Sequence, residues 1–365
     1  MQNISTAQNE YYKRPADERF PSIDALLTAA RDDKAQSVER TYNTRDLQAI
    51  STGESVQLAS PRGAATLTHW SFGQLARFVG APAGYLRELP ADLTAQCINH
   101  GLSELPTGST AQLLARPSSN GAPLIRALTS DKYGRLFDAD WLAPVVETLT
   151  RHDSRWTLPP TWDGKPAGAY RSDRDSFLVL VNGGSIVNDP SAANGKGEMY
   201  RGLMIRNSEV GAASVCIEQI LFRFICGNHM FWSAMMDRTF RRRHVGTTVK
   251  RDTVREIADI AYRWTQQSAS RDEAIIRTLI DHEIAHSDAA IIDELQKMGA
   301  TKDQAKDAVK SAAVYESHSP RSFWGIANGF TRISQDSGYQ DDRYDLDRIG
   351  AKILARGLKQ YAVAA

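Results

Sequence analysis

The spacing of apolar residues changes twice along this chain, and that change limits its folds more than any other feature. Between about residues 111 and 225, apolar residues form short strand-like runs, as in SFLVLV and ASVCIEQILFRFIC. On both sides of this region they recur every three to four residues, as in amphipathic helices. The pattern predicts an α+β protein with a helical N-terminal part, a central antiparallel β-sheet with long hairpins, and a helical C-terminal third.

Changes in polarity and periodicity along the chain give the expected limits of the domains. Residues 1–20 are polar and lack periodicity, so a disordered tail is expected there. A helical N-terminal subdomain should follow over 21–105, and an antiparallel sheet core over 106–250. The remaining region, 251–365, should be helical. Its expected helices lie at about 253–268, 272–297, 301–315, 320–336 and 344–360.

Caps and turns give local predictions inside these regions. Ser22 is a candidate helix N-cap, and Ser71 with Gln74 fits a capping box for a helix that stops at Gly80. The Asn182-Gly183-Gly184 segment between two apolar runs predicts a tight hairpin turn. A hairpin around the Ser-Ser-Asn-Gly turn at 118–121 and a longer one around 209–211 are also expected.

Charge and cysteine content narrow the class of protein. The 44 Lys and Arg against 43 Asp and Glu leave a formal net charge of +1, so affinity for nucleic acid would require a local patch. Three cysteines without a C-x-x-C pair argue against a disulfide framework or a structural zinc. No signal-peptide apolar region or membrane-length apolar segment occurs. We therefore expect a cytoplasmic protein with no membrane partner, and, lacking glycine-rich nucleotide loops, no cofactor.

Four blocks of sequence together resemble a known family. They are TLTHWSFGQLARFVGAPAGYLRELP (66–90), YRGLMIRNSEVGAASVCIEQILFRFICGNHMFWSA (200–234), RRRHVG (241–246) and SPRSFWGIANGFTR (319–332). They are similar to the phage and plasmid-like proteins grouped as domain of unknown function 932, over roughly residues 60–360. The most specific parts are Asn207 to Gly211 and Cys226 to Asn228. The resemblance implies a protein of phages, plasmids or integrated elements, and it implies no particular reaction.

Basic and aromatic residues are concentrated between residues 223 and 263, a segment that contains nine Lys and Arg but only four Asp and Glu. Arginines that pair with phosphates, beside rings on which bases stack, are what a groove for single-stranded nucleic acid needs. The candidate nucleic-acid-binding residues are Arg238, Arg241, Arg242, Arg243, Lys250 and Arg251 for phosphates, with Trp232 and Phe240 for stacking. The ordinary alternative is a solvated basic face, with Phe222 and Phe224 in the core.

The function expected from this segment and from the implied habitat is that of a non-enzymatic accessory protein. It would bind nucleic acid, with single-stranded DNA as the favoured ligand, during recombination or replication. It would act as a homo-oligomer. A protein-interaction module whose terminal helices bind a host factor is an alternative. The interpretation requires that the basic residues converge on one open groove.

An H-E-x-x-H motif supplies one enzymatic alternative. If the motif lies in a helix, His282 and His286 share one face and could hold zinc, with Glu283 as general base of a peptidase. Asp303 or Asp307 would have to supply a third ligand. The structural alternative is an amphipathic helix that carries these side chains at its edge and binds no metal.

A metal-dependent nuclease is the other enzymatic alternative, with magnesium held by Glu209, Asp173 and Asp175. Cys226 and His229 suggest a cysteine nucleophile, but a cysteine that ends an apolar strand is usually an inert buried thiol.

The simpler interpretation of the hairpin around residue 209 is structural. Asn207 and Ser208 would satisfy backbone groups of the turn through side-chain hydrogen bonds. Glu209 would then pair with Arg206 or Arg201, and no metal would be held.

Overall fold

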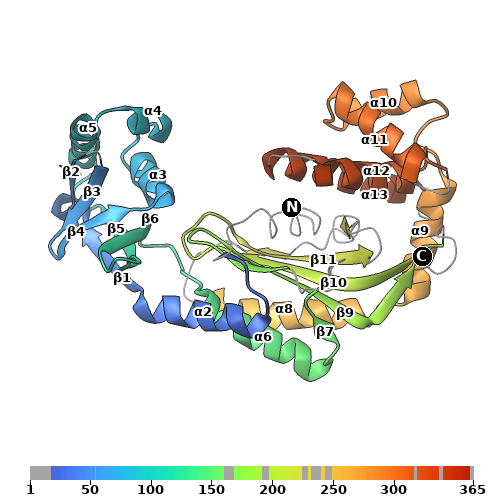
Figure 1. Ribbon diagram of the computed structural model, residues 1–365, viewed down its shortest axis with the longest axis horizontal. Helices are drawn as coiled ribbons and strands as arrows, with labels where there is room; N and C mark the ends of the chain where they lie inside the picture. Colours follow the sequence, from blue (N-terminus) through green and yellow to red (C-terminus); the bar gives the residue numbers. More distant parts are fainter. Residues whose placement is uncertain are drawn as a thin grey trace.

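The computed structural model describes most of the chain and confirms the α+β class, with helices in its N- and C-terminal parts around a central sheet (Figure 1). The described residues are 18–53, 55–159, 168–190, 197–223, 229–231, 240–242, 249–315, 319–336 and 340–361. Within them, no helix is both long and apolar enough to cross a membrane.

An N-terminal unit is built on a six-stranded sheet of order β1-β5-β6-β4-β3-β2, antiparallel except between β4 and β6 (Figure 1). Its strands are β1 (Val38–Asn43), β2 (Gln48–Thr52), β3 (Ser55–Ser60), β4 (Gly63–Leu67), β5 (Thr110–Pro117) and β6 (Pro123–Thr129). Its helices are α3 (His69–Phe78), α4 (Ala83–Glu88) and α5 (Ala91–Glu104), and η2 (Thr44–Asp46) is a short 3-10 turn. Leu75, Ile98 and Leu113 belong to a core of this unit's own.

The strands of this unit differ from the sequence expectation in two ways. Residues 38–67 form four strands inside the region expected to be helical, because small residues such as those of GAATL give little period-two signal. The hairpin of β5 and β6 closes as expected through Gly121, which has φ of 81°. It joins the N-terminal sheet, however, so the region expected to be one sheet core contributes to two sheets.

The central sheet has the order β12-β11-β10-β9-β7, with β13 paired to β11 and β8 paired to β9. Its strands are β7 (Trp156–Thr157), β8 (Ala169–Arg171), β9 (Ser176–Asn188), β10 (Glu198–Asn207), β11 (Val215–Arg223), β12 (His229–Phe231) and β13 (Phe240–Arg242). The antiparallel pairing of β10 with β11 confirms the long hairpin, whose turn spans 208–214.

The tight turn expected at Asn182-Gly183-Gly184 is wrong. Strand β9 continues through this segment, and its register with β10 shifts between Tyr200 and Gly202, which makes the segment a β-bulge. A two-residue hairpin turn needs positive φ, and neither Gly183 nor Gly184 has it. Asn-Gly therefore marked an irregularity in the backbone but not the end of a strand.

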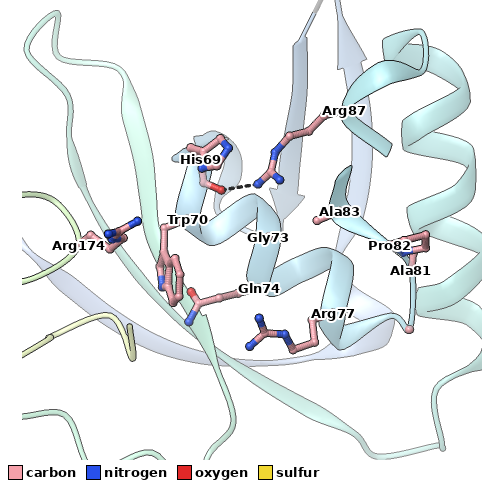
Figure 2. Close-up of a pocket in the computed structure, with 11 residues that line it drawn as sticks. His69, Trp70, Gly73, Gln74, Arg77, Ala81, Pro82, Ala83, Arg87 and Arg174 are labelled. Atoms are coloured by element: carbon pink, nitrogen blue, oxygen red, sulfur yellow. Dashed lines mark hydrogen bonds between the residues drawn. The ribbon is translucent and has the colours of Figure 1, made fainter. Parts of the chain in front are cut away.

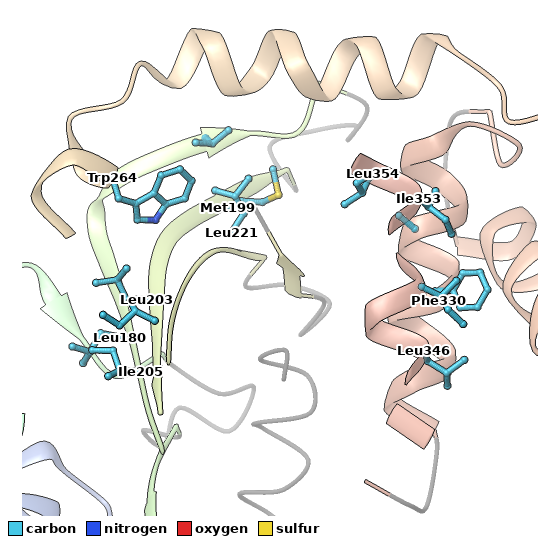
Figure 3. Packing of buried hydrophobic residues seen from close by; sticks show 14 of the residues in the cluster. Leu180, Met199, Leu203, Ile205, Leu221, Trp264, Phe330, Leu346, Ile353 and Leu354 are labelled. Atoms are coloured by element: carbon cyan, nitrogen blue, oxygen red, sulfur yellow. The ribbon is translucent and has the colours of Figure 1, made fainter. Parts of the chain in front are cut away.

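Helices cover the central sheet and extend beyond it (Figure 1). Along one face lie α2 (Ile23–Gln36), α6 (Asp138–His152) and α8 (Val249–Thr265). The C-terminal helices are α9 (Ala269–Asp281), α10 (Asp288–Lys297), α11 (Lys302–Tyr315), α12 (Phe323–Asp336) and α13 (Gln340–Tyr361). One hydrophobic cluster includes Leu203 of β10, Trp264 of α8, and Phe330 and Ile353 in the C-terminal helices (Figure 3). Burial of this apolar surface is the main force that stabilises the larger part of the protein.

Candidate nucleic-acid interface

The basic segment singled out from the sequence falls outside the described side chains. Arg238, Arg243 and Trp232 lie outside the described residues altogether. For Phe240, Arg241, Arg242, Lys250 and Arg251 the backbone alone is described, in β13 and at the start of α8. Strand β13 pairs antiparallel with residues 215–217 of β11. The convergence of these side chains on one groove therefore stays a prediction.

A second basic site is formed by side chains that the structure describes. A groove of about 690 Å³ opens between α3, the start of α4 and the turn from β8 to β9 (Figure 2). Its lining residues are His69, Trp70, Gly73, Gln74, Arg77, Gly80, Ala81, Pro82, Ala83, Arg87 and Arg174. Three arginines and a histidine are among them, and no carboxylate is. Because nothing in this lining is negative, the groove attracts anions.

One face of α3 forms the floor of this groove because its lining residues are three to four positions apart, at 69–70, 73–74 and 77. The opposite face carries Leu75 and Ala76 into the core. The helix begins one residue after Thr68, whose Oγ1 accepts a hydrogen bond from the Ser71 backbone at 3.1 Å. The expected N-cap at Ser71 is therefore wrong, whereas the stop at Gly80, with φ of 74°, is confirmed.

None of the three groove arginines forms an ion pair with another described residue. The Arg77 side chain is exposed, and its guanidinium has neither a hydrogen bond nor an ion pair within the described part of the chain. Arg87 donates from Nη2 to the His69 carbonyl at 2.9 Å, as Figure 2 shows. The guanidinium of Arg174 lies 5.8 Å from the centre of the Trp70 ring. All three positive charges therefore remain available to an anionic ligand.

Trp70 and Gln74 attach α3 to the hairpin turn of the central sheet. The Trp70 indole Nε1 donates to the Val210 carbonyl at 3.0 Å, and Gln74 Nε2 donates to the same oxygen at 2.7 Å. Gln74 Oε1 accepts from the Leu128 backbone at 3.0 Å, so Gln74 forms no capping box. With its N–H engaged by protein, Trp70 can offer a ligand only contact with its ring, which is how aromatic side chains bind unpaired bases.

A buried network of charges lies where the N-terminal unit meets the central sheet. Its members are Arg116 (β5), Arg126 (β6), Arg171 (β8), Asp33 (α2), Asp138 (α6) and Glu209 (hairpin turn). Arg126 Nη1 donates to Asp33 at 2.8 Å and to Glu209 at 3.0 Å. Three arginines pair with three carboxylates, so the formal charges of the network balance, with Arg116 the partly exposed member. Such a network can be tolerated in a core because each charge has partners.

Two carboxyl pKa values in the network shift in opposite directions. Burial raises the pKa of the Asp33 carboxyl, but the charges of Arg126 and Arg171 outweigh burial and leave this pKa below its usual value. Burial and the neighbouring Glu209 raise the pKa of the Asp138 carboxyl. Asp138 accepts hydrogen bonds from Ser176 at 2.8 Å and from Asn207 at 2.7 Å. As pH falls, Asp138 therefore becomes protonated before Asp33 does.

We expect the Asp33→Asn variant to be less stable than the wild type at pH 7 by about 1.5–3 kcal/mol, a typical value for charged hydrogen bonds. A lowered pKa in the folded state stabilises the protein above the unfolded value of 3.8 and stops doing so as pH falls through the folded value. The difference between the two proteins should therefore shrink below about pH 4. Urea unfolding at several pH values measures it, and a pH-independent difference would contradict this account.

Glu209 has a structural role, with hydrogen-bond partners that differ from those expected from the sequence. The expected pairing of Glu209 with Arg206 or Arg201 is wrong. Instead Oε2 accepts from Arg126 and from Arg171, at 2.8 Å for the latter, and Oε1 accepts from the Asp138 backbone at 2.9 Å. Strand spacing cannot predict these partners, because the first two lie 83 and 38 residues away.

The neighbouring Asn207 and Ser208 form different kinds of contact. The Ser208 hydroxyl accepts from the Ala212 backbone at 2.8 Å, which confirms its expected role in the turn. Asn207 reaches outside the turn, to the Leu136 carbonyl at 2.9 Å and to Asp138. The alternative magnesium site has no support, since both Glu209 oxygens are occupied by protein and no cluster of three metal-binding side chains occurs in the described residues.

The helix assumed for the H-E-x-x-H motif is wrong. Helix α9 ends at Asp281 and α10 begins at Asp288, so the motif lies in the connection between them. His282 stacks on Tyr361 at 3.9 Å between ring centres, and Glu283 accepts from the Ser319 hydroxyl at 3.1 Å. His286 is fully exposed. The shared helical face on which a zinc site depended does not exist here, and Asp303 lies on the exposed side of α11.

Comparisons with known proteins give one result. Neither the curated proteins nor the solved structures yield a match. A protein-family model described as Domain of unknown function (DUF932) matches residues 145–349, which is a shorter range than the 60–360 expected from the sequence blocks. Helices α3 and α4 of the groove precede the matched range, and Arg174 lies within it. Since the match covers more than half of the 365 residues, the protein belongs to the DUF932 family.

Proposed function

We propose that this protein binds nucleic acid through the groove between α3, α4 and the β8–β9 turn, and that its preferred ligand is single-stranded DNA. The single observation that supports this function is the lining of that groove, with Arg77, Arg87, Arg174 and His69 and without a carboxylate. Phosphodiester groups are anions that arginine binds through paired N–H donors. The Trp70 ring beside Arg174 adds a surface on which an unpaired base can stack.

The basic segment at 238–251 belongs to the same proposal. Its arginines would extend the contact with phosphates beyond the groove, and a homo-oligomer would lengthen it further. A role in recombination or replication on a phage or plasmid fits the habitat that the sequence blocks imply. These parts of the proposal rest on sequence, whereas the groove rests on described side chains.

We expect the double variant Arg77→Ala/Arg87→Ala to bind a fluorescein-labelled 30-nucleotide single strand about a hundredfold more weakly than the wild type. Each lost charged contact is worth about 1.5 kcal/mol, or roughly tenfold in affinity. The slope of log affinity against log salt should also fall by about 0.7 for each phosphate contact removed. Fluorescence anisotropy at three salt concentrations measures both quantities.

Arg151→Ala is the matched control for this experiment. Arg151 is exposed on α6, away from the groove, and its only ion pair among the described residues is with Glu147 one helical turn away. We expect its affinity to equal that of the wild type. Wild-type protein that does not bind the strand, or that binds it independently of salt, would overturn the proposal. Equal affinity for a duplex of the same length would remove the preference for single strands.

A further inference from the structure

We infer that binding in the groove is coupled to the docking of the N-terminal unit on the central sheet, and that Glu209 is a positioning residue for this site. The inference rests on the proposed function and adds its regulation. It follows from the origin of the two walls of the groove. Arg77 and Arg87 come from the N-terminal unit, whereas Arg174 comes from the turn between β8 and β9 of the central sheet.

The wall that carries Arg174 is held in place by residues of the charge network and the hairpin turn. The Arg174 carbonyl accepts a hydrogen bond from the Ser208 hydroxyl at 2.7 Å. The carbonyl of residue 173 lies 3.4 Å from Arg126 Nη2. Arg171, at the end of β8, donates to Glu209 at 2.8 Å. The position of Arg174 therefore depends on the same turn in which Glu209 lies.

The opposite wall is attached to that turn as well. Trp70 and Gln74 both donate to the carbonyl of Val210, the residue that follows Glu209. Tyr133, in the segment after β6, donates to the Ser208 carbonyl at 3.0 Å. One hairpin turn thus sets the distance between the two walls. Glu209 holds this turn to Arg126 of the N-terminal unit and to Arg171 of the central sheet.

Coupling follows from this arrangement. A phosphate chain that contacts Arg77, Arg87 and Arg174 at once fits only the docked arrangement of the two units. A ligand that prefers one arrangement shifts the population toward it, and the docked arrangement in turn raises affinity for the ligand by the same factor. Nucleic acid bound in the groove therefore acts as a clamp across the interface.

A double-mutant cycle in the full-length chain tests the positioning role. Glu209→Gln should weaken binding of the labelled 30-nucleotide strand about tenfold, although all three groove arginines remain. Arg174→Ala should weaken the wild type by a similar factor but weaken Glu209→Gln protein much less, because Arg174 is already displaced there. Ser208→Ala, which removes one hydrogen bond to the Arg174 carbonyl, provides the same test if Glu209→Gln does not fold.

Hydrogen exchange supplies the second readout. Adding the strand should slow amide exchange at residues 208–214, and Arg77→Ala/Arg87→Ala protein should lose this protection. If the wild type binds the strand but Glu209→Gln and Ser208→Ala bind equally well, or if the cycle is additive, the coupling is overturned and the proposed function stands. If the wild type does not bind at all, both proposals fall.

Discussion

Arg126→Met should lower the free energy of unfolding by about 3–5 kcal/mol, because removal of one partner from a buried charge pair leaves the others without compensation. Arg126 is 2% exposed, and its Nη1 contacts carboxylates of both Asp33 and Glu209. Methionine keeps much of the apolar stem of arginine, so the loss is mainly one of charge. Arg171 alone would then face the three carboxylates from within the buried part of the network.

Urea unfolding followed by circular dichroism measures this change, and Arg151→Met is the matched control. Arg151 is 73% exposed and pairs with Glu147 on the surface of α6. Exposed pairs of this kind contribute about 0–1 kcal/mol, so the control should unfold close to the wild type. Equal stabilities of the two variants would mean that the charge network does not hold the units together.

Gly329→Ala should destabilise the protein by about 3 kcal/mol, at the upper end of the usual cost of overpacking. Gly329 lies in α12 where this helix packs against α11. A Cβ at this position would lie 2.2 Å from the carbonyl oxygen of Ala308. That oxygen belongs to helix backbone and cannot rotate away, so the two helices must move apart. The expected result is a lower midpoint in urea with retained helical content.

Gly350→Ala is the control for the same substitution in another helix of the bundle. A Cβ there would meet the Ala327 carbonyl and Phe330 Cβ at 3.6 Å, which is ordinary van der Waals contact. Because alanine favours a helix over glycine by about 1 kcal/mol, this variant should be as stable as the wild type or slightly more stable. If both variants changed stability in the same direction, the close approach of α11 and α12 would be in doubt.

Local sequence patterns predicted the parts of this protein that depend on local physics. The Ser22 cap accepts from the Ala25 backbone at 3.1 Å, Gly80 ends its helix, and the hairpins around 118–121 and 209–211 are present. Each depends on residues a few positions apart. Predictions failed where a side chain bonds to a partner distant in the sequence. Gln74, for example, forms hydrogen bonds with the backbone of Leu128 and Val210 instead of the expected capping box.

The same contrast explains the split of the predicted helix at 272–297. Its apolar spacing continues through the motif at 282–286, so periodicity alone favoured one helix. The Ile284 backbone N–H instead donates to the Arg321 carbonyl at 3.0 Å, and the Phe323 backbone N–H donates to the His282 carbonyl at 3.2 Å. These hydrogen bonds to a segment almost 40 residues away replace helical ones. The chemistry inferred for His282 and His286 depended on the helix and could not survive its loss.

The sequence alone determined the α+β class and the family of this protein, because side-chain periodicity and short motifs are properties of neighbouring residues. Only the tertiary structure decided which charges meet. Arg77, Arg87 and Arg174 come to one groove, and Asp33, Arg126 and Glu209 to one buried network, although they are far apart in the chain. Electrostatic attraction acts through space between atoms a few ångströms apart, and a linear count of charges contains no such distances.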